Sequence, residues 1–201
     1  MDPRLLYHIT PISNLSRILE AGGLLPHNRL VAGAYTDVSH AHIQERRAHR
    51  QIPCGPRGTL HDYVPFFFCN RPPMLYSIHK KGRQRDMIYI VTSIEKVREN
   101  NHRFVFSDGH AAMRFSNFYD NETAIENIDW PLMKATYWTD TVDDTDRQRR
   151  RQAEFLIHDF VPVSSWLGIA VQSQRMETSV KKILAEFDLD VYINIKNDWY
   201  Y

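Results

Sequence analysis

The chain has 201 residues, of which 43% are apolar and 12% aromatic. A chain of this length and composition can bury most of its unfolded surface around one core, so global disorder is excluded and a single domain over residues 1–201 is expected. Lysine and arginine number 25 against 24 aspartates and glutamates, and the resulting formal charge of +1, taken whole, argues against a dedicated polyanion binder.

This near neutrality is the sum of two opposite stretches. Residues 42–85 carry nine lysines and arginines against two acidic residues, a net charge of +7. Residues 117–146 carry eight acidic residues against Lys134 alone, a net charge of −7. Such segregation is compatible with a phosphate-bearing partner on one face, and equally with two solvated loops.

The N-terminal residues predict a strand, a turn and a helix. Residues 6–10 read as a short strand, and apolar residues follow at helical spacing from Leu15 to Leu19. Ser13 is the expected N-cap of this helix, and Gly22 is expected to end it.

The rest of the chain mixes strands and helices without regular alternation. Further strands are expected at residues 64–69, 87–92, 103–106, 153–158, 167–172 and 190–195. Helices are expected at residues 39–50, 72–79 and 177–187, with shorter helical pieces at 122–128 and 131–136. This order indicates an α+β fold and not a doubly wound sheet. A polar, turn-rich tract at residues 139–146 lies in a long excursion of the kind that is usually functional or mobile.

Several classes of protein are disfavoured by what the sequence lacks. Cys54 and Cys69 form no Cys-x-x-Cys pair, and we expect both to be reduced and structural. The ten histidines lack a metal-ligand spacing, so no metal is expected. No apolar run approaches the roughly 20 residues that span a bilayer, and the first residues do not resemble a signal sequence. A cytoplasmic protein without membrane contact is therefore expected.

Two polar residues of the first strand are candidates for ligand binding. Strand alternation places His8 and Thr10 on one face, opposite Tyr7 and Ile9. Such a pair can form hydrogen bonds to a ribose hydroxyl and an amide. The alternative is a histidine whose hydrogen bonds are satisfied within the protein.

Arg46 and Arg47 are a second candidate. They point about 100° apart on a helix, so only one of them can face a given site. The planar fork of arginine suits a diphosphate, because it donates to two oxygens at once. The alternative is a basic helix exposed to solvent.

Glu154 is a third candidate. It shares a strand face with Leu156 and His158 and follows the arginine-rich residues 147–151, where cations can hold it ionised. There it could accept a hydrogen bond from a ribose hydroxyl and stabilise an oxocarbenium-like transition state, or form a strand-end salt bridge. The chain has no Gly-x-Gly-x-x-Gly motif, so any bound dinucleotide is held by a fold other than a Rossmann unit.

Long strings of the sequence resemble the DarT family of DNA ADP-ribosyltransferases, the toxins of bacterial toxin–antitoxin systems. The matching strings, in order, are LYHITPISNLSRILEAGGLLPHN, SHAHIQERRA, GTLHDYVPFFFCNRPPMLYSIH, FVFSDGHAAMRF, ATYWTD, RQAEFLIHDFVP and NDWYY. They cover nearly the whole chain.

The resemblance implies an ADP-ribosyltransferase fold similar to that of poly-ADP-ribose polymerases, with a split central β core, flanking helices and a cleft for NAD. It assigns catalysis to Arg47 and Glu154. It assigns NAD binding to His8, Ile9, Thr10, Arg17, Leu25, Arg47, Met74 and Tyr76. Phe67 stands where relatives often have tyrosine, which removes a hydroxyl from that position.

The resemblance also implies the substrates and partners. Residues of about 110–154 correspond to the segment that recognises the acceptor base. The implied reaction is mono-ADP-ribosylation of a base, most closely thymidine, in single-stranded DNA. The implied partner is a DarG-like macrodomain antitoxin, and a monomer is expected.

Two other functions stay open from the residues themselves. The first is a non-catalytic single-strand binder that uses Tyr63, Phe66 and Phe67 as a stacking platform. The buried character of residues 64–68 counts against it. The second is a transferase of the same fold that acts on another base, on RNA or on protein.

Overall fold

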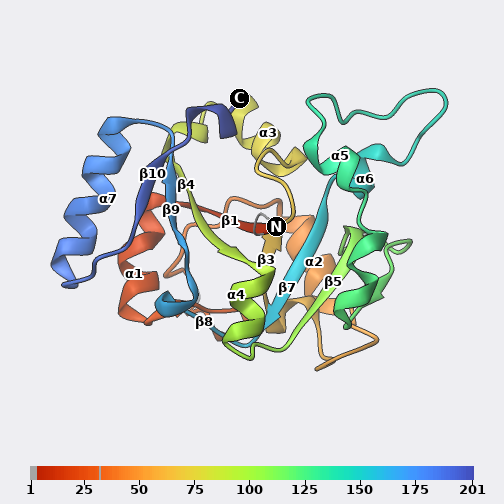
Figure 1. Ribbon diagram of the computed structural model, residues 1–201, viewed down its shortest axis with the longest axis horizontal. Helices are drawn as coiled ribbons and strands as arrows, with labels where there is room; N and C mark the ends of the chain where they lie inside the picture. The colour runs from red at the N-terminus through yellow and green to blue at the C-terminus, as the bar shows by residue number, and fades with distance from the viewer. Residues whose placement is uncertain (1–3, 32) are drawn as a thin grey trace.

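The computed structural model describes residues 4–31 and 33–201. Within them, eight strands form one sheet in the order β10-β9-β4-β1-β3-β7-β5-β6 (Figure 1). Its strands are β1 (Leu5–Pro11), β3 (Tyr63–Phe67), β4 (Met87–Ser93), β5 (Phe104–His110), β6 (Phe118–Tyr119), β7 (Ala153–His158), β9 (Gly168–Val171) and β10 (Ile193–Ile195). A separate small sheet pairs β2 (Gly23–Leu24) with β8 (Val161–Pro162).

Helices lie on the sheet and at its ends. They are α1 (Leu15–Glu20), α2 (Ala41–His49), α3 (Pro73–Lys80), α4 (Ile94–Glu99), α5 (Trp130–Lys134), α6 (Arg147–Arg150) and α7 (Gln174–Glu186). Among the sheet's strand pairs, β9 with β10 is parallel and the others are antiparallel, which confirms the predicted α+β class. None of the described helices has the length and apolarity needed to cross a bilayer.

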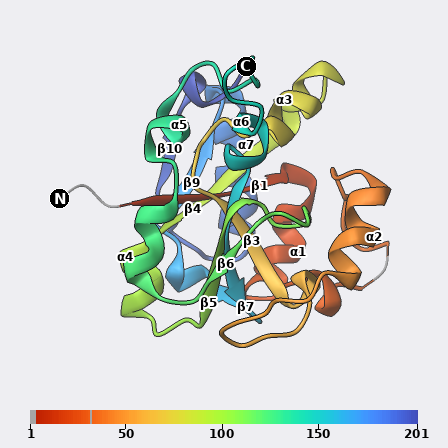
Figure 2. The ribbon, with the colours of Figure 1, turned by 90° about the vertical axis from the view of Figure 1, so that its right-hand side faces the viewer.

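The main core lies between the sheet and helices α1, α4, α5 and α7. Phe66 and Phe155 are fully buried on this face, and Leu15 of α1 and Val180 of α7 belong to the same apolar cluster. In Figure 2, α2 lies at the right-hand edge of the molecule, beyond α1, and none of its residues is buried. The core therefore leaves α2 free to border a cavity.

The sheet is split between β1 and β3. β1 pairs with β4 from Leu5 to Pro11, but it meets β3 only at Tyr7 and Phe67. Continuing that register would place Pro65 opposite Ile9, where proline has no N–H to complete the ladder. The two strands separate beyond this point, which gives the split β core expected from the resemblance.

One local prediction differs from the structure. Ser13 is not the cap of α1: a 3-10 turn at Ile12–Asn14 precedes the helix, and Asn14 stands at its N-cap without a side-chain cap bond. The Asn14 side chain instead bonds Thr10 and Thr36. Gly22, with φ of +76°, ends the helical segment as predicted.

Two helices, α4 and α6, were not predicted. α4 follows β4 directly, and the Ser93 hydroxyl accepts a hydrogen bond from the backbone N–H of Lys96 at its start. A serine followed by helix-forming residues is the local signal that could have identified it.

The acidic stretch is mostly paired inside the molecule. Its carboxylates form ion pairs with arginines, namely Glu122 with Arg98, Glu126 with Arg4, Asp129 and Asp144 with Arg150, and Asp146 with Arg149. The net charge of −7 in the sequence therefore does not become one free acidic surface.

Candidate active site

The split between β1 and β3 places His8 at the base of a cleft. Its Nδ1 lies 2.8 Å from the carbonyl oxygen of Pro65. Since a carbonyl can only accept, Nδ1 is the donor, and Nε2 of the neutral ring is left as an acceptor. Burial lowers the pKa of His8 and outweighs the hydrogen bond to Pro65, so the ring is neutral at physiological pH.

A buried ion pair joins α2 to β7 beside His8. Arg47 Nη1 donates to Glu154 Oε2 at 2.8 Å, and the side chains are 11% and 4% exposed. The backbone N–H of Ala111 donates to Glu154 Oε1 at 2.9 Å, and Nδ1 of His110 lies 3.5 Å from the same oxygen. Burial raises the pKa of Glu154, but the charge on Arg47 and the contact with His110 outweigh it and lower that pKa to about 2. The carboxylate is therefore ionised at neutral pH.

One nitrogen of the Arg47 guanidinium has no hydrogen-bond partner within the described chain. This nitrogen, Nη2, is buried. A buried donor without a partner costs free energy. Of the five such side-chain donors among the described residues, this one belongs to the residue that lines both cavities, where a ligand could satisfy it. The neighbouring Arg46 is exposed on another face of α2, as the helical spacing predicted.

Two adjoining cavities meet at this pair and share His8, Ile9 and Arg47 in their walls. The first has a volume of about 370 Å³ and the second about 430 Å³. Both volumes fall in the range of about 300–1,000 Å³ that is typical of small-molecule sites. The second also contains Glu154 and His110, so it holds the charged end of the cleft.

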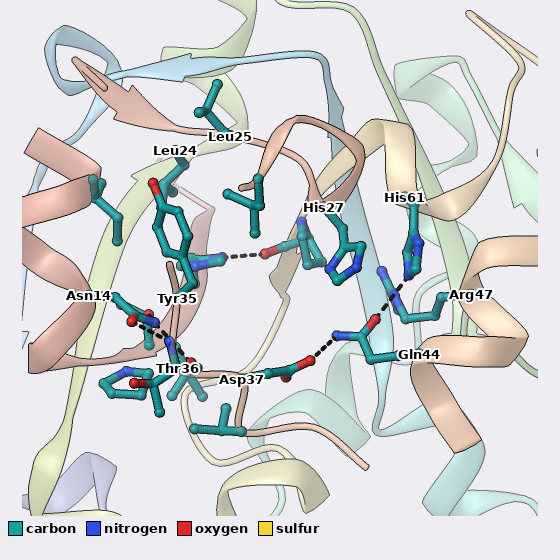
Figure 3. Close-up of a pocket in the computed structure, with 18 of the residues that line it drawn as sticks. Asn14, Leu24, Leu25, His27, Tyr35, Thr36, Asp37, Gln44, Arg47 and His61 are labelled. Carbon is teal, nitrogen blue, oxygen red and sulfur yellow. Dashed lines mark hydrogen bonds between the residues drawn. The ribbon is translucent and has the colours of Figure 1, made fainter. Parts of the chain in front are cut away.

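A polar chain fixes the wall of the first cavity (Figure 3). Gln44 Nε2 donates to Asp37 at 2.8 Å, and its Oε1 lies 2.9 Å from His61 Nε2. Because the Gln44 oxygen can only accept, His61 donates from Nε2. Burial, followed by the charges of His27 and Arg47, lowers the pKa of His61 to about 4, so this ring is also neutral.

A second polar contact ties down the loop over the first cavity. Asn14 donates to the Thr36 carbonyl at 3.0 Å and accepts from the Thr36 N–H at 2.8 Å. Figure 3 shows Tyr35 and Leu25 on the same side of the cavity. This pairing holds the loop backbone in place across the cavity opening.

Most of the expected site residues come together in the cleft. His8, Ile9, Thr10, Leu25 and Arg47 line the first cavity. Met74, Phe67 and Glu154 line the second.

Two of the expected residues lie outside both cavities. Arg17 contributes its backbone carbonyl to a bond with Tyr35. The Tyr76 ring packs against Trp138 and Tyr201. Neither residue lines the two cavities, and their assignment to NAD binding stays a prediction.

Sequence reasoning missed the residues that hold the cleft in shape. Asn14, Asp37, Gln44 and His61 all line the first cavity, and no motif identified them. Gln44 had one usable signal: it lies three residues before Arg47 on α2, so the two share a helix face.

The aromatic platform of the non-catalytic alternative is not available at the surface. Tyr63 is 1% exposed and Phe66 is 0% exposed. Phe67 is half-buried in the wall of the second cavity. Within residues 4–31 and 33–201 there is no group of three or more histidine, cysteine or acidic side chains arranged to hold a metal ion.

Comparison with known proteins places the chain in one family. Residues 7–201 match the family model described as "ssDNA thymidine ADP-ribosyltransferase, DarT". A DNA ADP-ribosyl transferase of Thermus aquaticus is 40% identical over 99% of this chain and 90% of its own length.

Solved structures agree with this assignment. Thermus sp. 2.9 DarT in complex with ADP-ribosylated ssDNA superposes with a TM-score of 0.92 at 38% identity, covering 99% of this chain and 97% of that one. The same protein in complex with NAD⁺ gives a TM-score of 0.88 at 35% identity, covering 100% and 99%. The chain therefore belongs to the DarT family of single-stranded DNA thymidine ADP-ribosyltransferases.

Proposed function

We propose that the cleft around Arg47 and Glu154 transfers ADP-ribose from NAD⁺ to a thymidine base of single-stranded DNA. Membership of the DarT family makes the chain a DNA ADP-ribosyltransferase that uses NAD⁺. The observation that carries the residue assignment is the buried Arg47–Glu154 pair, whose spare Nη2 faces no protein acceptor.

The cleft has the donors and acceptors that NAD⁺ requires. The unpartnered Nη2 of Arg47 suits a diphosphate or ribose oxygen of the dinucleotide. The free Nε2 of His8 suits a hydroxyl or amide N–H on the nicotinamide side. We assign Ile9, Thr10 and Leu25 to the same subsite as neighbouring wall residues.

Glu154 is placed to act on the reacting ribose. A carboxylate has about four lone-pair sites, so Oε2 retains an acceptor position beyond its bond to Arg47. In the reaction the bond between nicotinamide and the anomeric carbon breaks, nicotinamide leaves neutral with the bonding electrons, and the anomeric carbon bonds to a ring nitrogen of the base, whose proton is released. The ionised Glu154 stabilises the positive charge that develops on the ribose.

Arg47 acts chiefly by orientation and charge. A guanidinium has a reference pKa above 12, which makes it a poor proton acceptor at neutral pH. Its bond to Glu154 fixes the carboxylate, while Nη2 holds the substrate.

The acceptor base enters from the second cavity. We assign residues 110–154 to its recognition, because His110, Gln148 and Gln152 from the two ends of this segment line that cavity beside Glu154. Met74 and Phe67 supply apolar wall for the ring. A base must be unstacked to reach this site, which favours a single strand.

We further propose that the whole chain acts as one monomeric domain and is counteracted by a macrodomain antitoxin. Family membership supports the antitoxin. Light scattering of the purified chain tests the monomer, and removal of ADP-ribose from modified DNA by a co-purified macrodomain tests the partner.

The acceptor is tested by side-by-side reactions with labelled NAD⁺. The acceptors are four single-stranded oligonucleotides that differ in the base at the target position, a matching RNA and a protein mixture. Every acceptor is also incubated with the Glu154→Ala variant. We expect label on the thymidine oligonucleotide alone and none with the variant. Equal or stronger labelling of RNA or protein would overturn the assignment, and full labelling by Glu154→Ala would refute the catalytic role.

A further inference from the structure

A shallow basic groove lies on the far side of α2 from the first cavity. One wall is α2, with Arg46, His49 and Arg50. The other is the turn after β5, with Arg114 and Phe115. The lining contains three arginines, Arg46, Arg50 and Arg114, and one acidic residue, Glu45, so the groove is positively charged.

The groove offers free cations and a free aromatic ring. Arg46 and Arg114 are exposed, and their side chains form no ion pair among the described residues. Phe115 is 81% exposed. Cations and an aromatic ring side by side are the combination that single-strand binding surfaces use.

Arg50 links the two walls of the groove. Arg50 crosses from α2 to the turn, where it donates to the carbonyls of Arg114 and Ser116 at 3.5 and 3.4 Å and stacks over Phe118. The Ser116 hydroxyl donates to the carbonyl of His110 at 2.7 Å and closes the turn. These contacts join the turn that carries Phe115 to the end of α2.

Residues of the groove are sequence neighbours of residues in the catalytic site. Arg46 precedes Arg47, and Ala112 of the groove follows Ala111, whose N–H bonds Glu154. Both walls of the groove are therefore continuous in sequence with residues of the site. Phosphates match the arginines, and an unstacked base matches Phe115.

We propose that this groove binds the single strand next to the modified thymidine, with Arg46 and Arg114 on backbone phosphates and Phe115 stacked on a neighbouring base. The inference rests on the proposed function, since it takes DNA as the acceptor. Arg50 acts as a positioning residue that holds the two walls together.

Binding of a fluorescent single-stranded oligonucleotide, measured by anisotropy between 50 and 200 mM salt, tests the groove. Each phosphate contact to a single strand contributes about 0.7 to the slope of log K against log salt, so Arg46→Gln with Arg114→Gln is expected to reduce the slope by about 1.4. Loss of one base–ring stack weakens binding about tenfold, which is the effect expected for Phe115→Ala. The exposed Arg175→Gln and Tyr192→Ala, on α7 and before β10, serve as matched controls.

Steady-state transfer kinetics complete the test. The groove variants should raise KM for the oligonucleotide and leave the Kd for NAD⁺ unchanged. If the groove variants bind DNA as tightly as the control variants and with the same salt slope, the groove proposal is wrong. A groove that binds a protein partner instead of DNA would give this same result. If wild type transfers nothing to DNA but the variants still lose DNA binding, the proposed function fails and the groove stands.

Discussion

Two arginines of similar burial form ion pairs in different parts of the molecule. Arg47 in the cleft is 11% exposed and pairs with Glu154, and Arg149 in α6 is 14% exposed and pairs with Asp108 and Asp146. Arg149 uses every nitrogen of its guanidinium within the protein, because Nε and Nη2 donate to Asp146 and Nη1 donates to Asp108. Arg47 leaves Nη2 without a partner.

The difference separates a structural pair from a functional one. Around Arg149 the fold adapts to the guanidinium: a Cβ on Gly109 would lie 2.3 Å from its Nη1, so that position has no room for a side chain. Around Arg47 the fold leaves space, and the two cavities meet there. Burial and charge alone do not distinguish the pairs, whereas the count of satisfied donors does.

The largest expected effect is that of Glu154→Gln. The neutral amide cannot stabilise positive charge on the ribose, so transfer should fall about 10³-fold. Mass spectrometry of the oligonucleotide product measures it, with binding of NAD⁺ to the variant as the check that the cleft is intact. Retention of transfer within a few-fold of wild type would remove Glu154 from the mechanism.

The next effect distinguishes Arg47 from its neighbour. Arg47→Ala removes both the partner of Glu154 and the spare donor, so kcat should fall about 10²-fold at saturating oligonucleotide. Arg46→Ala, on another helix face, should instead raise KM for DNA. A loss of kcat confined to Arg46→Ala would show that the wrong arginine has been assigned.

A smaller effect is expected for Arg149→Ala, and it falls on stability. The variant leaves Asp108 and Asp146 without their charged donor, which should lower the free energy of unfolding by about 2 kcal/mol. Urea unfolding measures the change, with the exposed Arg175→Ala as the control. Unchanged stability would mean that the Arg149 pair is not structural.

The smallest effect is on the pH dependence of stability. The pKa of His61 is about 4 in the folded protein, below its ordinary value of 6.5, so the unfolded chain binds more protons between these values. Its contribution is complete above pH 6.5 and is lost as the pH falls from 6.5 toward 4. We expect His61→Gln to flatten this part of the profile and the exposed His49→Gln to keep the decline. An identical decline in His61→Gln and wild type would contradict a neutral His61.

Local sequence patterns predicted the long elements and several short ones, but not the two-residue strands. The β-prone, buried run at residues 153–158 matches β7 residue for residue, and Arg46 and Arg47 diverge as helical spacing requires. The two-residue strands β2, β6 and β8 were not predicted, because they depend on partners far along the chain. No local pattern contains that information.

The sequence predicted the polar residues at the cleft, but not the residues that hold the cleft in shape. His8 and Glu154 stand out as polar residues in apolar strands, so the sequence alone marks them. The split that separates β1 from β3 depends on Pro65 facing Ile9. The position of the cavity wall depends on the hydrogen bonds of Gln44 to Asp37 and His61. These contacts join residues that are distant in sequence, so they require the folded chain.

The most direct measurement compares transfer per folded molecule for Glu154→Gln and Arg149→Ala on the same thymidine oligonucleotide, at a temperature where both are folded. The two variants break ion pairs whose arginines are similarly buried, one in the cleft and one in α6. We predict that Glu154→Gln binds NAD⁺ but loses transfer, while Arg149→Ala loses far less transfer despite its lower stability. Equal losses in the two variants, or retained transfer in Glu154→Gln, would contradict the assignment of the reaction to the Arg47–Glu154 pair.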